Sequence, residues 1–281
     1  NREMRVSILT ENVVYKRGFL AEHGLSLLID TGKEKYLFDT GQSNVFLYNA
    51  AKLRIDFGEL NGVILSHGHY DHCGGMEHWR ELGDVPIYIQ EKAFEKKYAE
   101  SFRSHDLRYI GLENKGNWQD EANVKKLSGG GTQIAEGVYL LSEIPYTTYF
   151  EPMMGSFWKS NSQHPGHHEL LVDSMEDEQL LVIEQEEGLC VFAGCAHVGI
   201  INCLRYVQTI FQDRKIHCLM AGMHLRNCDA KRLEKTIHIL KEQDIDIVVP
   251  MHCTGMRAIA AIRDFLGSAC VLPEAGKTIE I

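Results

Sequence analysis

The sequence lacks the long apolar runs of a membrane-spanning chain. No stretch approaches the ~18 consecutive apolar residues that a transmembrane helix requires. Residues 1–6 lead into a strand-like segment and contain no apolar core of the kind found in signal peptides. We therefore expect a cytoplasmic protein with no membrane partner.

The sequence also lacks a disulfide framework. Its eight cysteines are scattered, and their spacing matches no disulfide-rich or zinc-finger pattern. Cys190, Cys218 and Cys270 lie in apolar, strand-like stretches, where a cysteine usually serves as a small buried residue. We expect reduced thiols, as in a reducing compartment.

Positive charge is scarce. The chain has 29 Lys and Arg residues against 39 Asp and Glu residues, which gives a formal net charge of −10. Binding to nucleic acid requires a basic surface that neutralises phosphates, so we expect no nucleic-acid partner. A phosphate-binding loop is also missing, because Gly129-Gly130-Gly131 is not followed by Lys and Ser or Thr.

What the sequence does contain is a dense cluster of histidines. His67, His69, Asp71 and His72 directly follow the apolar run at residues 63–65. Neutral imidazole is a good ligand for zinc, iron and manganese, and a carboxylate compensates the charge of the ion. The interposed aspartate and the upstream strand favour a metal site over a solvated histidine-rich loop.

This motif, His-x-His-x-Asp-His after a strand, resembles the signature of the metallo-β-lactamase superfamily, whose members hold one or two metal ions between two β-sheets. Further segments that begin at residues 22, 37, 194, 222 and 251 are similar to motifs of one subgroup. That subgroup is named for 7,8-dihydropterin-6-methyl-4-(β-D-ribofuranosyl)aminobenzene 5′-phosphate synthase. The resemblance extends over nearly the whole chain.

The expected fold class is α/β, as a four-layer αββα sandwich. Early strands followed by alternating strands and helices agree with this architecture. We expect strands at 4–10, 24–30, 35–39, 62–66, 85–90, 179–184, 189–193, 216–220, 245–249, 270–272 and 278–281, and helices at 43–54, 75–82, 199–212, 229–242 and 256–266. Residues 1–281 are expected to form a single domain with an irregular, flap-like insertion at about 100–178.

A site with two metal ions needs further ligands from the second half. His197 and His252 each follow a predicted strand and precede a predicted helix. Sites in sheets with helical crossovers form in such loops. We therefore expect His67, His69 and His197 at the first ion, and Asp71, His72 and His252 at the second.

The second half departs from the commoner superfamily pattern at two places. The slot that usually holds a histidine, 174–177, has none, and the slot that usually holds an aspartate has Cys195. We favour His197 as the replacing imidazole, with His167 or His168 as the alternative. Cys195 is either a metal-bound thiolate or a small buried residue, and the sequence leaves both open.

Three more roles are predicted. Asp39 follows a strand whose end should approach the metal loop, so it is expected to orient a ligand histidine, with a turn-forming role as the alternative. His224 is expected to contact the substrate or donate a proton, although a core or capping role also fits. Asp71 is expected to orient the nucleophile and accept its proton.

The expected cofactors are two divalent metal ions, zinc first, with manganese and iron also compatible. Two such ions activate a water molecule, which predicts hydrolysis of a small phosphoester, ester or lactone. The subgroup resemblance implies an alternative, a transferase in which the metals activate a pyrophosphate leaving group. A di-iron redox protein ranks lower, because the chain has no additional flavin domain. The substrate is expected to be a small molecule, phosphorylated if the subgroup resemblance holds.

Overall fold

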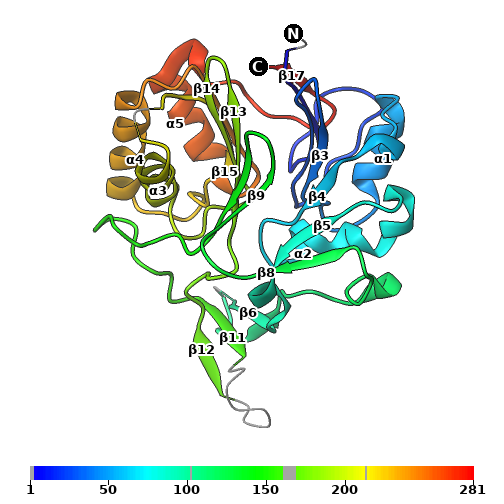
Figure 1. Cartoon of the computed structure of the whole chain (residues 1–281). Coiled ribbons are helices and arrows are strands. Elements are labelled where there is room, and N and C mark those ends of the chain that lie inside the picture. The colour runs from blue at the N-terminus through cyan, green and yellow to red at the C-terminus, as the bar shows by residue number, and fades with distance from the viewer. Residues whose placement is uncertain (1–2, 102, 161–168, 213) are drawn as a thin grey trace.

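Two β-sheets lie face to face, with helices on both outer sides (Figure 1). The structure is a computed structural model that describes residues 3–101, 103–160, 169–212 and 214–281. It confirms the expected α/β sandwich of four layers. The first and last strands of the described chain, β1 and β17, pair with each other, and a smaller third sheet extends from the opposite end of the sandwich.

The first large sheet is formed mainly by the N-terminal half. In the described chain its spatial order is β17 (Thr278–Glu280), β1 (Arg5–Thr10), β2 (Ser26–Asp30), β3 (Lys35–Phe38), β4 (Gly62–Ile64), β5 (Ile87–Gln90) and β8 (Val124–Leu127). Its outer face packs against α1 (Val45–Lys52), η1 (Phe57–Glu59) and η2 (Gly74–Leu82). The strands β3, β4 and β5 run parallel.

The second large sheet is formed mainly by the C-terminal half. Its order is β16 (Ile247–Met251), β15 (Ile216–Gly222), β14 (Gly188–Ala193), β13 (Leu180–Gln185), β10 (Val138–Leu141) and β9 (Gly131–Ala135). Its outer face packs against α3 (Ile200–Ile210), α4 (Ala230–Glu242) and α5 (Met256–Leu266). The strands β14, β15 and β16 run parallel.

Side chains alternate along these central strands and bury both faces of the second sheet. Leu181 and Ile183 point into the core between the sheets, whereas Leu180 and Val182 pack toward the helices. A strand buried on both faces is apolar at nearly every position, which is why the hairpin of β13 and β14 was recognisable in the sequence.

A small sheet lies below the sandwich in Figure 1, with the order β12 (Leu170–Val172), β11 (Phe157–Ser160), β6 (Lys97–Glu100) and β7 (Leu107–Tyr109). The remaining short helices are α2 (Tyr70–Cys73), η3 (Glu91–Phe94), η4 (Lys115–Asn117), η5 (His252–Thr254) and η6 (Gly267–Ala269). Among the described residues, no helix combines the length and apolarity that crossing a bilayer requires.

Three expectations about single elements were wrong. Residues 270–272 form no strand, because Cys270 makes only one isolated bridge, to Val248, before Pro273 ends the pairing. The expected helix at 75–82 is a 3₁₀ segment with a kink at His78. The stretch at 100–178 is more regular than expected, because it contributes β8, β9 and β10 to the two large sheets and most of the small sheet.

The two sheets approach each other closely at the edge where the parallel strands end. A Cβ atom on Gly194, after β14, would lie 2.1 Å from Ser66 Oγ, after β4. A Cβ atom on Gly222, at the end of β15, would lie 2.1 Å from the carbonyl oxygen of Gly194. Only glycine fits at these positions, and the absence of side chains lets loops from both sheets meet.

Candidate metal centre

Three histidines that were predicted to share an ion lie together. The ligand nitrogens of His67, His69 and His197 lie within 4.8 Å of one another. His67 and His69 come from the loop after β4, and His197 comes from the loop after β14. His67 Nε2 and both ring nitrogens of His197 are buried and have no hydrogen-bond partner among the described residues. Buried polar atoms are rarely left unpaired, so this set has the chemistry of a cation site.

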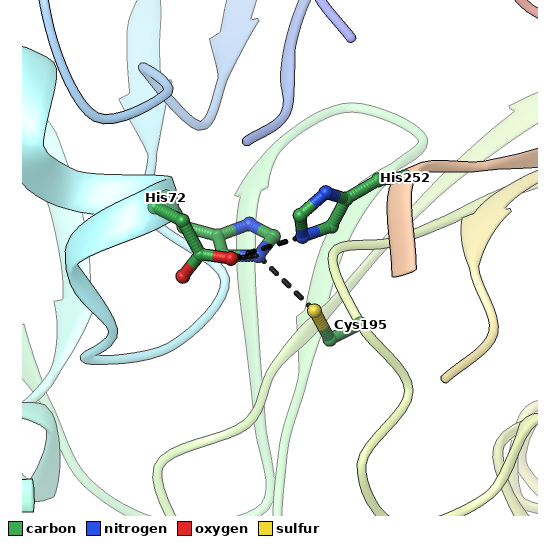
Figure 2. Close-up of side chains that lie close together, drawn as sticks. His72, Cys195 and His252 are labelled. Carbon is green, nitrogen blue, oxygen red and sulfur yellow. Dashed lines mark hydrogen bonds and ion pairs between the residues drawn. The ribbon is translucent and has the colours of Figure 1, made fainter. Parts of the chain in front are cut away.

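A second group adjoins the first. In this group, too, each residue has one ligand atom within 4.8 Å of those of the others; its members are Asp71, His72, Cys195 and His252. Asp71 Oδ2 lies 3.0 Å from His252 Nε2, and His72 Nε2 lies 3.1 Å from Cys195 Sγ. Figure 2 shows His72, Cys195 and His252 converging from separate parts of the chain.

The two groups share a boundary. The ring centroids of His67 and His72 are 4.3 Å apart. Cys195 also belongs to a third set, with His197 and His224, that meets the same distance limit. The sequence-predicted residues therefore come together, and His224 lies beside a member of each group, His197 and Cys195.

Asp39 holds two of the histidines in place. It is fully buried, and its Oδ2 lies 2.6 Å from His72 Nδ1. The same carboxylate accepts hydrogen bonds from the backbone N–H and the Oγ of Ser66, each at 2.7 Å, and Ser66 Oγ lies 2.8 Å from His67 Nδ1. The geometry is the one expected of a carboxylate that orients ligand histidines.

Two polar residues fix His252, and sequence reasoning missed one of them, Glu11. Asn12 Oδ1 lies 2.7 Å from His252 Nδ1, and Glu11 Oε1 accepts a hydrogen bond of 2.5 Å from the backbone N–H of His252. Burial raises the pKa of Glu11. The available signal was that both polar residues directly follow β1, whose end lies at the same edge as the metal loop.

A further pair of carboxylates supports the loops. Glu178 accepts hydrogen bonds from the backbone N–H groups of His197 and Val198, at 2.8 and 3.1 Å. Burial raises the pKa of Glu178 to about 8. Asp177, in the slot where the commoner pattern has a histidine, accepts a hydrogen bond of 2.7 Å from the backbone N–H of Gly68 in the metal loop. Asp177 therefore supports the metal loop at the position where the commoner pattern has a histidine.

The protonation states of the first group suit metal binding. Burial lowers the pKa of His67 and His197 well below the ordinary value, and lowers that of His69 to about 4. These imidazoles are therefore neutral at neutral pH, as ligation requires. Burial acts to raise the pKa of Asp71, but the adjacent imidazoles, His72 foremost, outweigh it and hold this pKa well below its usual range.

Members of both groups, His69 and His197 of the first and Asp71, Cys195 and His252 of the second, line a cavity of about 740 Å³. His23 and His224 also line it, and His23 Nε2 lies 3.2 Å from Asp71 Oδ2. Phe157, from β11 of the small sheet, covers the first group, with ring centroids 5.8 Å from His69 and 4.9 Å from His197. The cavity volume is in the range of small-molecule sites.

Comparison with known proteins identifies the family to which this fold belongs. The family model of the metallo-β-lactamase superfamily matches residues 21–138. A protein of Methanocaldococcus jannaschii named 7,8-dihydropterin-6-methyl-4-(β-D-ribofuranosyl)-aminobenzene-5′-phosphate synthase is 30% identical over 261 residues, which cover 87% of this chain and 85% of that protein. The chain belongs to the metallo-β-lactamase superfamily.

Two other similarities extend over more of the chain. An uncharacterized protein of the same archaeon is 30% identical over 262 residues, covering 92% of this chain and 93% of that protein. The crystal structure of a metal-dependent hydrolase of the β-lactamase superfamily has 32% identity and a TM-score of 0.84, and covers 99% of both chains. Family and fold together support a metal-dependent enzyme.

Four other histidines and cysteines near the predicted ligands lie outside both ligand groups or outside the described residues. The rival ligands His167 and His168 lie outside the described residues. Cys73 donates a hydrogen bond to the carbonyl oxygen of His67, at 3.1 Å, and belongs to neither ligand group. Cys253 lines the cavity but also stays outside both groups.

Proposed function

We propose that this superfamily member is a dinuclear metal-dependent hydrolase that acts on a small phosphoester, ester or lactone. The observation that carries the proposal is a pair of adjoining ligand groups, each with members on the wall of one cavity. The groups are His67, His69 and His197, and Asp71, His72, Cys195 and His252. Their buried, unpartnered ring nitrogens fit a pair of divalent cations.

Zinc is the proposed metal. The second group combines imidazole, carboxylate and a thiol, and thiolate is a soft ligand that favours zinc over manganese. Burial raises the pKa of the Cys195 thiol well above its ordinary value. Its conversion to a thiolate therefore needs a bound cation, which removes the proton outright.

Bound divalent ions supply an acidic water molecule and stabilise negative charge that develops on the substrate. The protein's own groups do the rest. Asp71, ionised and in contact with His252, orients the attacking water and accepts its proton. His224 Nδ1, which has no hydrogen-bond partner among the described residues, lies beside His197 in the cavity and delivers a proton to the leaving group.

The small sheet acts as a flap over this centre. Phe157 lies against His69, His197 and His224 and so keeps bulk water from the first ligand group. In this proposal residues 1–281 form a single catalytic domain, and the small sheet contributes Phe157 of β11 and Ala99 of β6 to the lining of its substrate site.

One observation favours a second function. The relative from Methanocaldococcus jannaschii that carries a synthase name is 30% identical to this chain. A transferase on the same scaffold would use the metal ions to activate a pyrophosphate leaving group, with an aromatic carbon as nucleophile in place of water.

Metal analysis together with a chromogenic substrate tests the proposal. Purified protein, stripped with a chelator and reloaded with zinc, is expected to hold about two ions per chain and to hydrolyse bis(4-nitrophenyl) phosphate. His67→Ala and His252→Ala should each lose one ion and about 100-fold or more in rate. His105→Ala, at an exposed position outside the ligand groups, is the matched control.

Full metal content and full rate in both ligand variants would contradict the proposal. Pyrophosphate release that depends on an aromatic acceptor, in zinc-loaded protein that does not hydrolyse the phosphodiester, would support the transferase instead.

A further inference from the structure

One wall of the cavity is a face of α5. Met256, Ile259, Ala260 and Arg263 all line the cavity, and their spacing of three and four residues puts them on one side of the helix. The first three side chains are apolar and the last carries a guanidinium. Because α5 begins directly after the turn that carries His252, this stripe leads away from the second ligand group. Seven residues of helix span about 10 Å.

Further apolar side chains line the same cavity. They are Val13 and Tyr15, from the loop after β1, and Leu272 and Pro273, from the loop after η6. Tyr15 is 78% exposed and Met256 is 76% exposed. Exposed large apolar side chains that line a cavity, such as Tyr15 and Met256, are typical of surfaces that bind an apolar ligand.

Three arginines line the cavity, although the chain as a whole is acidic. Arg108, Arg226 and Arg263 line the cavity of a protein with a net charge of −10. The ion pairs formed by arginines among the described residues involve only Arg5 and Arg214, so the three cavity arginines are unpaired there.

Arg263 marks the far end of the apolar stripe. One of its N–H groups donates to the carbonyl oxygen of Cys270, which fixes the side chain and leaves further donors of the guanidinium free. Asp264 also lines the cavity, and its carboxylate offsets part of the positive charge of Arg263.

The carboxylates of Glu11 and Asp71 lie at the metal end. Arg226 lies against Gly255, directly after the turn that carries His252, and Arg108 lies over the ring of Tyr70, next to His69. Arg263 is therefore the cavity arginine at the far end of the apolar stripe.

From these features we infer that the substrate is an elongated, amphipathic anion. Its reacting group lies at the metal centre, its apolar body lies along Met256 and Ile259, and an anionic group at its far end binds Arg263. The inference rests on the proposed hydrolytic function, and it adds the class of substrate that this cavity selects.

Three esters of matched length test the inference. The zinc-loaded protein is assayed with 4-nitrophenyl octanoate, with mono-4-nitrophenyl suberate, which adds a carboxylate at the far end, and with the 4-nitrophenyl ester of ω-amino-octanoic acid, which adds an ammonium there. The suberate monoester should have a kcat/KM about fivefold above that of the octanoate. The amino ester should fall below both. The preference should shrink as salt is raised.

Variants of Arg263 assign the preference to one side chain. Arg263→Gln should abolish the ranking of the three esters, whereas Arg263→Lys, which keeps the charge, should retain part of it. Arg205→Gln is the matched control, because Arg205 is an exposed arginine of α3 that does not line the cavity. Equal rates for all three esters in the wild-type protein, or loss of the ranking in Arg263→Lys as complete as in Arg263→Gln, would overturn the inference.

Binding without turnover separates this inference from the proposed function. Suberate and octanoate each offer one carboxylate to the metal centre, and only suberate has a second for Arg263. Calorimetry should show about fivefold tighter binding of suberate to the wild-type protein and equal binding to Arg263→Gln. If no ester is hydrolysed, the proposed function fails for esters while this comparison still decides the inference. Equal affinity for the two acids refutes it.

Discussion

At the scale of single residues, Asp39 is a clear test of how the site is held. Its carboxylate contacts His72 and Ser66, and it has a left-handed backbone with φ of 58°. Asn tolerates this conformation, so Asp39→Asn should keep the fold. The amide presents an N–H where His72 needs an acceptor, and loss of such an orienting partner typically costs 10–100-fold in metal affinity.

We therefore expect Asp39→Asn to bind zinc about 10–100-fold more weakly, measured by competition with a chromogenic chelator. Asp56→Asn is the control, because Asp56 is exposed, caps η1 and belongs to neither ligand group. Equal zinc affinity in Asp39→Asn and the wild-type protein would show that Asp39 does not orient His72 for binding.

Cys195 supports a second prediction at the same scale. If its thiolate binds metal, the cobalt-loaded protein should show a thiolate-to-cobalt charge-transfer band in the near ultraviolet. Cys195→Asp should lose this band and accept manganese more readily, because a carboxylate is a harder ligand than a thiolate. Cys253→Ser should keep the band, since Cys253 lines the cavity but belongs to neither ligand group. A band that survives in Cys195→Asp would assign Cys195 a structural role only.

Elements differ in how readily the sequence reveals them. The hairpin of β13 and β14 and the helices α3, α4 and α5 were predicted to within a few residues, because apolar periodicity and flanking turns agree there. The small sheet was not predicted. Its strands are three or four residues long, partly exposed, and paired across long separations, as in the pairing of Phe157 with Ala99. Short strands of this kind have no periodic signal.

The anchor of the small sheet gives a prediction at the element scale. Lys97, on β6, is buried, and its Nζ lies 2.9 Å from Asp173 and 3.3 Å from Asp177. Asp177 also holds the metal loop at Gly68. Lys97→Met leaves two buried carboxylates without their cation, which should lower the free energy of unfolding by about 3–5 kcal/mol in chemical denaturation. Lys215→Met removes an exposed ion pair with Asp246 and should leave the free energy of unfolding nearly unchanged.

The loss of unfolding free energy in Lys97→Met should depend on pH. Burial acts to raise the pKa of Asp177, but Lys97 outweighs it and lowers this pKa below its ordinary value. The stability that this carboxylate contributes is therefore present above its ordinary pKa of about 4 and is lost as pH falls through the lowered value. The difference between wild type and Lys97→Met should be largest near neutral pH and shrink in acid. A deficit independent of pH would point to packing and not to the ion pair.

For the whole molecule, the convergence of the two halves was predictable but the supports of the site were not. His197 and His252 could be placed because residues after parallel strands gather at one sheet edge. Glu11 lies 241 residues before His252 along the chain, and no local pattern links the two. The same holds for Phe157, whose role depends on where the small sheet docks. Chemistry carried by a motif is visible in a sequence, whereas contacts between distant segments appear only in the folded chain.

The site also joins the two sheets, which leads to a prediction about global stability. His67 and His72 follow a strand of the first sheet, and His197 and His252 follow strands of the second. These ligands come together only in the folded chain, so metal binding must stabilise folding. Free zinc at about 100 times its Kd should add about 2.7 kcal/mol, a rise in Tm of roughly 5–10 °C in a thermal melt. A variant with both His67→Ala and His252→Ala should show little of this rise, and an equal rise in that variant would mean that zinc stabilises the protein elsewhere.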